Sequence, residues 1–178
     1  FTTANGLLNN RIRAIEVDNQ GNIWVGTNSG VSKFNGTNWT NYTTTNGLAS
    51  NNIYSIHADN NSNIWVGTQY GISKYNGNWQ TFYNSIGVEF WHVTAICSDN
   101  QNNVWFSSVN NILRFDGTQW TISSLNYSYI NSFIIDNQNN KWLGTINKGI
   151  FFNNGTNWIN YMSSGGLLTD YIWSIAID

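Results

Sequence analysis

Residues that could carry out catalysis are few in this sequence. It holds nine acidic residues, two histidines and one cysteine in 178 residues. His57 and His92 have no acid or cysteine nearby at the spacing of a metal site. Glu89 and Asp170 could be paired as the two carboxylates of a glycosidase, but nothing in their spacing supports that pair. We therefore expect no catalytic residues, no metal site and no cofactor in this chain.

Four further aspartates share one setting, an Asp-Asn-x-x-Asn-x-Trp stretch. Each stretch supplies one carboxylate at its start, whereas a calcium loop uses several acidic ligands. An aspartate in a turn accepts hydrogen bonds from backbone N–H groups two residues on, and asparagine or glycine tolerates left-handed backbone. We interpret these aspartates as turn-forming, with calcium binding as the alternative: Asp18, Asp59, Asp99 and Asp136.

The tryptophans of these stretches define an internal repeat. Trp24, Trp65, Trp105 and Trp142 are 41, 40 and 37 residues apart, a period typical of stacked or radial repeat proteins. Each unit contains four short apolar runs separated by Asn- and Gly-rich turns, and none has a sustained helical period. The first run precedes the turn aspartate, the second holds the tryptophan, and an Asn-Gly or Asp-Gly hairpin signal separates the third from the fourth.

Four short strands in about 40 residues form the pattern of a β-propeller blade. We predict an all-β fold, a single β-propeller segment over residues 1–178. Four complete four-stranded blades are expected at approximately 11–50, 52–90, 92–127 and 129–169, with partial repeats at 1–10 and 171–178. Strand one is predicted at 12–18, 53–59, 93–99, 130–136 and 172–178. Open strand edges can pair with other strands, so we expect further blades or additional copies to complete a larger propeller.

The motifs resemble the two-component regulator propeller repeat. They are Gly-Asn-Ile-Trp-Val-Gly-Thr, Gly-Val-Ser-Lys-Phe-Asn-Gly, Trp-Thr-Asn-Tyr and the Asn-Gly-Leu before an Ile-containing strand. Repeat three departs from the pattern, with Ser107-Ser108 in place of Gly-Thr. The resemblance implies a sensor region of a bacterial hybrid histidine kinase or a related secreted protein, in the periplasm or outside the cell. It also implies that any kinase activity lies outside this chain.

Comparison of the repeats separates scaffold positions from variable ones. At the two positions that lie seven and five residues before each turn aspartate, the residue type changes from repeat to repeat. The position between them is always Ile or Val. By the resemblance, these positions and the loop with Glu89, Phe90 and Trp91 lie on the face where propellers bind ligands. The variable residues are rich in aromatics, amides and arginine, which suit sugars. The predicted ligand-binding residues are Arg11, Arg13, Tyr54, Glu89, Trp91, His92, Tyr129, Tyr171 and Trp173.

The composition and the net charge argue against several classes of function. A net charge of −2 provides no basic surface, so nucleic acid is not expected as a partner. Cys97 lies in an apolar run and is expected in the core, and no apolar run has the length of a membrane helix. We expect a non-catalytic ligand-binding or sensing module with an oligosaccharide ligand. The alternatives are a secreted adhesion or protein-interaction propeller and, less directly supported, a glycan-active hydrolase or lyase.

Overall fold

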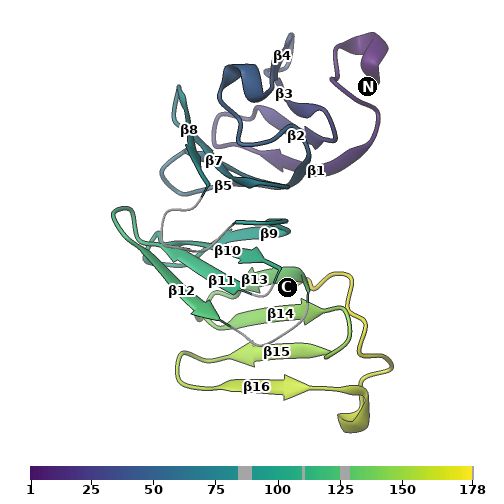
Figure 1. The fold of residues 1–178 in the computed structure, drawn as a ribbon, viewed down its shortest axis with the longest axis vertical. Helices are drawn as coiled ribbons and strands as arrows, with labels where there is room; N and C mark the ends of the chain where they lie inside the picture. Colours follow the sequence, from purple (N-terminus) through teal and green to yellow (C-terminus); the bar gives the residue numbers. More distant parts are fainter. Residues whose placement is uncertain (84–89, 110, 125–128, 178) are drawn as a thin grey trace. The chain divides into compact units, whose positions relative to one another are not determined.

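The computed structural model describes residues 1–83, 90–109, 111–124 and 129–177. The chain divides into two compact units, Phe1–Val93 (unit 1) and Thr94–Asp178 (unit 2). The described residues form four separate four-stranded sheets, two in each unit, and in every sheet the antiparallel strands follow one another in chain order (Figure 1). The predicted all-β fold is confirmed, and we call the sheets the first to fourth blades.

Unit 1 contains the first and second blades. The first consists of β1 (Ile12–Val17), β2 (Ile23–Thr27), β3 (Gly30–Phe34) and β4 (Trp39–Tyr42), and the second of β5 (Ile53–Ala58), β6 (Ile64–Thr68), β7 (Gly71–Tyr75) and β8 (Trp79–Phe82). Short 3-10 turns η1 (Thr3–Asn5) and η2 (Thr44–Asn46) precede the two blades.

Unit 2 contains the third and fourth blades. The third consists of β9 (Ala95–Ser98), β10 (Val104–Ser108), β11 (Asn111–Phe115) and β12 (Trp120–Ser124), and the fourth of β13 (Ile130–Ile135), β14 (Lys141–Thr145), β15 (Ile150–Asn153) and β16 (Trp158–Tyr161). The 3-10 turn η3 (Ser163–Gly165) follows the fourth blade.

The turn between the first two strands of each blade is built around its aspartate. In the second blade, Asp59 Oδ1 accepts the backbone N–H groups of Asn61 and Asn63 at 2.9 and 2.8 Å, and Oδ2 accepts the indole N–H of Trp65 at 2.7 Å. The other three blades repeat this arrangement. The residue three positions after the aspartate has a positive φ, as at Ser62 (64°). The aspartate therefore both folds the turn and holds the tryptophan of strand two.

Tryptophan and β-branched side chains fill the space between neighbouring blades of a unit. In unit 1, Trp24 of the first blade packs against Ile53 and Ile56 of the second, in one cluster with Tyr75 and Trp79. The Lys33 ammonium covers the Trp24 ring at 5.0 Å, and equivalent residues cover the corresponding tryptophans of the other blades. The aromatic residues thus supply much of the apolar area buried between blades.

Strand two carries a glycine that faces strand one of the next repeat. Because glycine has no side chain, neighbouring repeats can pack closely. A Cβ on Gly26 would lie 2.6 Å from Ile53 Cγ2, and one on Gly144 would lie 2.6 Å from Ile172 Cγ2. Residue 172 therefore meets the fourth blade in the same way as strand one of the second blade meets the first blade.

Two predicted strands differ from the structure. Strand one of the third blade begins at Ala95 rather than Val93, because Ser107, which replaces the glycine of the other blades, accepts the Ala95 N–H through its hydroxyl at 3.0 Å. The Thr94 hydroxyl donates to the Ile130 carbonyl at 2.6 Å. The predicted strand at 172–178 is wrong for the described residues 172–177, which form no strand. The physical reason is that the described part of unit 2 places no strand two beside them, although the Ile172 N–H still donates to the Thr145 carbonyl at 2.8 Å.

Candidate functional site

A β-bulge lies near the start of strand one in three of the blades. The pairing register shifts between Ile12 and Ala14, and equivalent shifts occur in the second and fourth blades. The extra residues are Arg13, Tyr54 and Asn131, at the variable position five before the turn aspartate. A bulge leaves its extra residue outside the regular pairing and re-aims the side chain. The fold thus projects a variable residue from a fixed framework.

These bulges lie at the end of the blade where strands two and three turn, because Ile12 pairs with Thr27 and Ile53 with Thr68. In unit 1 we call this end the unit 1 rim. It comprises the strand-one starts, the turns between strands two and three, and the residues at 91–92 that contact them, namely Asn10, Arg11, Arg13, Asn28, Asn52, Tyr54, Gln69, Tyr70, Trp91 and His92.

Three predicted site residues form a continuous row on the unit 1 rim. The Arg13 guanidinium carbon lies 4.7 Å from the centre of the Tyr54 ring. The Tyr54 and His92 rings then meet edge to face, with centroids 5.3 Å apart. Arg11 and Arg13 line a hollow of about 600 Å³ together with Tyr54. The structure therefore brings together residues that are up to 81 positions apart in the sequence.

A second aromatic pair occupies the same rim. Trp91 is 48% exposed and meets Tyr70, which is 50% exposed, edge to face at 6.1 Å. The amide of Gln69 donates to the Tyr70 hydroxyl at 3.0 Å and accepts from Asn52 at 3.1 Å. These amides hold the Tyr70 ring in place beside Trp91.

Two predicted site residues have strained backbone. His92 and Tyr129 occupy the same repeat position and have φ values of 49° and 43°. A left-handed backbone is uncommon for residues other than glycine, although asparagine, aspartate and histidine adopt it more often than the rest, and such strain is concentrated at functional sites. This observation supports a role for the position seven residues before the turn aspartate.

The remaining predicted residues are placed differently. In unit 2, Tyr171 and Trp173 pack together with ring centroids 5.0 Å apart, and Trp173 is 75% exposed. Tyr129 is also exposed, but no described ring contact joins it to this pair. Glu89 lies outside the described residues. Phe90 belongs to the variable loop by sequence, but it is buried in unit 1 and is a packing residue.

The turn aspartates at the opposite end of the blades have their oxygens occupied by N–H donors. Although burial raises the pKa of Asp99, hydrogen bonds from Asn103 and Trp105 outweigh this effect and lower it. Asp18 behaves in the same way, with burial opposed by donors from Trp24 and Asn22. Within the described ranges, no group of three or more His, Cys, Asp and Glu side chains could hold a metal ion. These observations favour the turn-forming interpretation over calcium binding.

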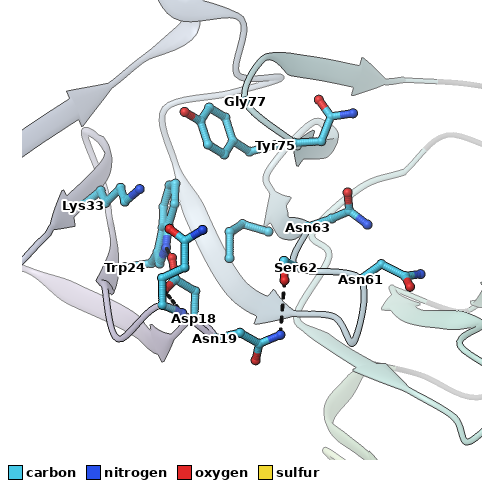
Figure 2. Close-up of a pocket in the computed structure, with 12 residues that line it drawn as sticks. Asp18, Asn19, Trp24, Lys33, Asn61, Ser62, Asn63, Tyr75 and Gly77 are labelled. Carbon is cyan, nitrogen blue, oxygen red and sulfur yellow. Dashed lines mark hydrogen bonds between the residues drawn. The ribbon is translucent and has the colours of Figure 1, made fainter.

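Another hollow of unit 1, of about 410 Å³, lies among these turns. Figure 2 shows Lys33 and Trp24 on one side of it and Asn61, Ser62 and Asn63 on the other. Asn19 donates to the Ser62 hydroxyl at 3.3 Å, and Asp18 accepts the Trp24 indole N–H at 2.8 Å (Figure 2). Several of its polar groups are thus engaged in holding the turns, and we do not assign the ligand site here.

Sequence comparison missed several residues of the rim. Asn28, Gln69 and Tyr70 lie in the turns between strands two and three, which the comparison of strand-one positions does not cover. Comparing these turns across repeats, as was done for strand one, would have found Tyr70. The cysteine, which was expected in the core, is partly buried and packs against the core cluster of unit 2, and burial raises the pKa of the Cys97 thiol far above its usual range.

None of the described helical segments is long and apolar enough to cross a membrane.

Comparison with known proteins supports the family resemblance. The family model described as "Two component regulator propeller" matches residues 6–29 and 47–70. A search of curated proteins gives no match. Among solved structures, the extracellular domain of a hybrid two-component system from B. thetaiotaomicron is similar over 94% of this chain and 25% of its own, with 23% identity and a TM-score of 0.80. A second such domain from that organism is similar over 88% of this chain and 23% of its own, with 25% identity and a TM-score of 0.77.

Enzymes share the architecture as well. A virginiamycin B lyase from Staphylococcus aureus is similar over 85% of this chain and 55% of its own, with 15% identity and a TM-score of 0.71. At that identity the likeness shows the fold alone. This chain spans about a quarter of the length of the B. thetaiotaomicron domains that it matches. Residues 6–29 and 47–70 thus match the two-component regulator propeller repeat, and the described residues have the fold of a β-propeller segment.

Proposed function

We propose that this chain is a non-catalytic ligand-binding module of a bacterial sensor protein, located in the periplasm or outside the cell. The family match and the extracellular domains of the B. thetaiotaomicron systems support the sensor role and the location. Any kinase activity would then lie outside residues 1–178.

The ligand proposed for the unit 1 rim is an oligosaccharide. The observation that carries this proposal is the row of Arg13, Tyr54 and His92, which places aromatic rings next to the hydrogen-bond donors of a guanidinium group. Sugar rings stack on aromatic faces through their C–H groups, and their hydroxyls need donors and acceptors around them. Trp91 and Tyr70 add a second exposed aromatic surface on the same rim.

A thermal-shift screen with oligosaccharides tests this proposal. A ligand that binds only the folded chain at one hundred times its Kd stabilises it by about 2.7 kcal/mol, which raises the Tm measurably. Tyr54→Ala and Trp91→Ala should abolish the shift. Phe1→Ala is the matched control, because Phe1 is an exposed aromatic of unit 1 that packs on Phe34 and Trp39, away from the rim. Absence of a shift across the screen would reject the oligosaccharide ligand.

We also propose that this segment belongs to a larger propeller. On β1, Ile15 is 62% exposed, whereas the equivalent Ile56 of the second blade is 8% exposed because it packs against the first blade. Ile12 and Val17 are exposed on the same strand. A preceding blade of the same repeat type, from a longer chain or a second copy, would cover this apolar face. Light scattering showing a strict monomer, together with a longer chain in which Ile15 stays exposed, would contradict this proposal.

The main alternative is a protein-interaction or adhesion propeller. It is favoured by the exposure of Tyr70 and Trp91, because exposed aromatic residues often anchor protein interfaces. In that case Tyr70→Ala would weaken a protein contact without any saccharide effect. An enzyme acting on glycans is the remaining alternative, and product formation from a bound oligosaccharide would support it over the non-catalytic proposal.

A further inference from the structure

The unit 1 rim concentrates positive charge in a chain that has little of it. Three arginines occur in the sequence, and two of them, Arg11 and Arg13, are two residues apart at this rim. Both line the hollow of about 600 Å³ beside Tyr54. Both are exposed at the surface.

The hydrogen-bonding capacity of these arginines is largely unused. Arg13 donates from Nε to Asn28 Oδ1 at 2.6 Å and lies over the Tyr54 ring at 4.7 Å. This leaves the two terminal nitrogens of its planar fork without an intramolecular acceptor among the described contacts. Neither guanidinium forms an ion pair with a carboxylate in the part of the chain that the structure describes.

The acidic residues of unit 1 for which a structure is described lie toward the other end of the blades. Asp18 and Asp59 are in the turns between strands one and two. Glu16 pairs in register with Trp24, four residues beyond Ile12 along β1. These carboxylates therefore do not neutralise the hollow, and an anionic group that enters it meets two guanidinium groups.

We infer that the hollow recognises an acidic saccharide, with Arg11 and Arg13 binding its carboxylate or sulfate group while Tyr54 stacks on the ring that carries it. This inference rests on the proposed function and names the ligand class. A guanidinium fork can bind two oxygens of one oxyanion at once. Asn28 and the Tyr54 ring restrict Arg13, so less side-chain entropy is lost on binding.

The experiment is calorimetric titration of the 178-residue chain with digalacturonate, a sulfated disaccharide and the neutral disaccharide galactobiose. The acidic ligands should bind at least tenfold more tightly than the neutral one, and added NaCl should weaken their binding. Loss of one charged hydrogen-bonding partner costs about ten- to a hundredfold in affinity, so Arg11→Gln and Arg13→Gln should each weaken acidic ligands by that factor. Lys33→Gln, which removes one charge from the opposite end of unit 1, should have little effect.

The possible outcomes distinguish the acidic-saccharide inference from the proposed function on which it rests. Preference for digalacturonate or for the sulfated disaccharide tells which oxyanion is bound, and either result supports the inference. Equal binding of neutral and acidic disaccharides, still dependent on Tyr54, would overturn the inference and leave the proposed function standing. Acidic binding that is unchanged by both arginine substitutions would also overturn it, as would inorganic sulfate binding as tightly as the sulfated disaccharide. Binding of no saccharide at all would reject the proposed function as well.

Discussion

Replacing Asp59 with alanine should destabilise unit 1 strongly. Asp59 is 5% exposed and accepts the backbone N–H groups of Asn61 and Asn63, the side-chain amide of Asn63 and the indole N–H of Trp65. Trp65 is itself 1% exposed, so water cannot easily replace the lost acceptor. A buried donor left unsatisfied costs about 1–3 kcal/mol. The N–H groups of Asn61 and Asn63 also lose their acceptor, although water can partly replace it. We therefore expect Asp59→Ala to lower the free energy of unfolding by about 3–5 kcal/mol in total.

Equilibrium urea denaturation followed by tryptophan fluorescence measures this loss. A double-mutant cycle with Trp65→Phe isolates the bond to the indole N–H, and we expect a coupling energy of about 1.5–3 kcal/mol. Asp136→Ala provides the matched comparison, because its turn is more exposed and its bond to the Trp142 indole is longer, 3.1 Å. The reasoning is refuted if Asp59→Ala costs less than about 1 kcal/mol or no more than Asp136→Ala.

Three further predictions concern packing and titration. Burial lowers the pKa of His57, and nearby Asp59 offsets this only in part. The folded state therefore favours the neutral imidazole. Its contribution to the free energy of unfolding is fully present above the unfolded pKa of about 6.5 and is lost as the pH falls through the lower folded pKa. His57 should therefore lower the unfolding free energy as the pH falls from 7 to 5, against the opposite contribution of Glu16, whose pKa burial raises. His57→Gln should make the slope with pH over this range less positive, and an unchanged slope would contradict this. Gly67→Ala should cost about 2–3 kcal/mol in urea denaturation, because its Cβ would clash with the Val93 carbonyl oxygen, whereas Gly165→Ala, in open space, should cost little. Since burial raises the pKa of the Cys97 thiol, a thiol reagent should label the native chain much more slowly than the unfolded chain, and equally rapid labelling of both would contradict this.

The repeat period and the turn residues were sufficient to predict the blades. Asn-Gly and Asp-Gly turns, the tryptophan of strand two and the turn aspartates all recur at fixed offsets, and each corresponds to one local structure. Residues 1–7 (Phe-Thr-Thr-Ala-Asn-Gly-Leu) and 42–48 (Tyr-Thr-Thr-Thr-Asn-Gly-Leu) are similar in sequence and form the same capped 3-10 turn. Strand ends were harder to predict where neighbours decide them, as at Ala95, whose N–H donates to the Ser107 hydroxyl.

The site was only partly predictable. The bulge was not predicted, although the sequence contains a signal for it. Ile53 and Ile56 are both apolar but three positions apart, and a regular strand places residues at that spacing on opposite faces. The bond between Asp59 and Trp65 was also missed, although the same spacing of six recurs in every repeat. The burial of Phe90 depends on contacts within unit 1 that no local pattern reveals. The row from Arg13 to His92 needed the three-dimensional structure, since it joins three segments that are distant in the sequence.

The central claim is that the unit 1 rim, built on a bulge repeated from blade to blade, is the ligand-binding surface. The most direct test is nuclear magnetic resonance mapping of backbone amide shifts during titration of the labelled chain with an acidic disaccharide. The account predicts that within unit 1 the shifts are largest at Arg13, Tyr54 and His92, and that they are lost in Tyr54→Ala. Shifts centred instead on the turns of Asp18 and Asn61, at the opposite end of the blades, would contradict it.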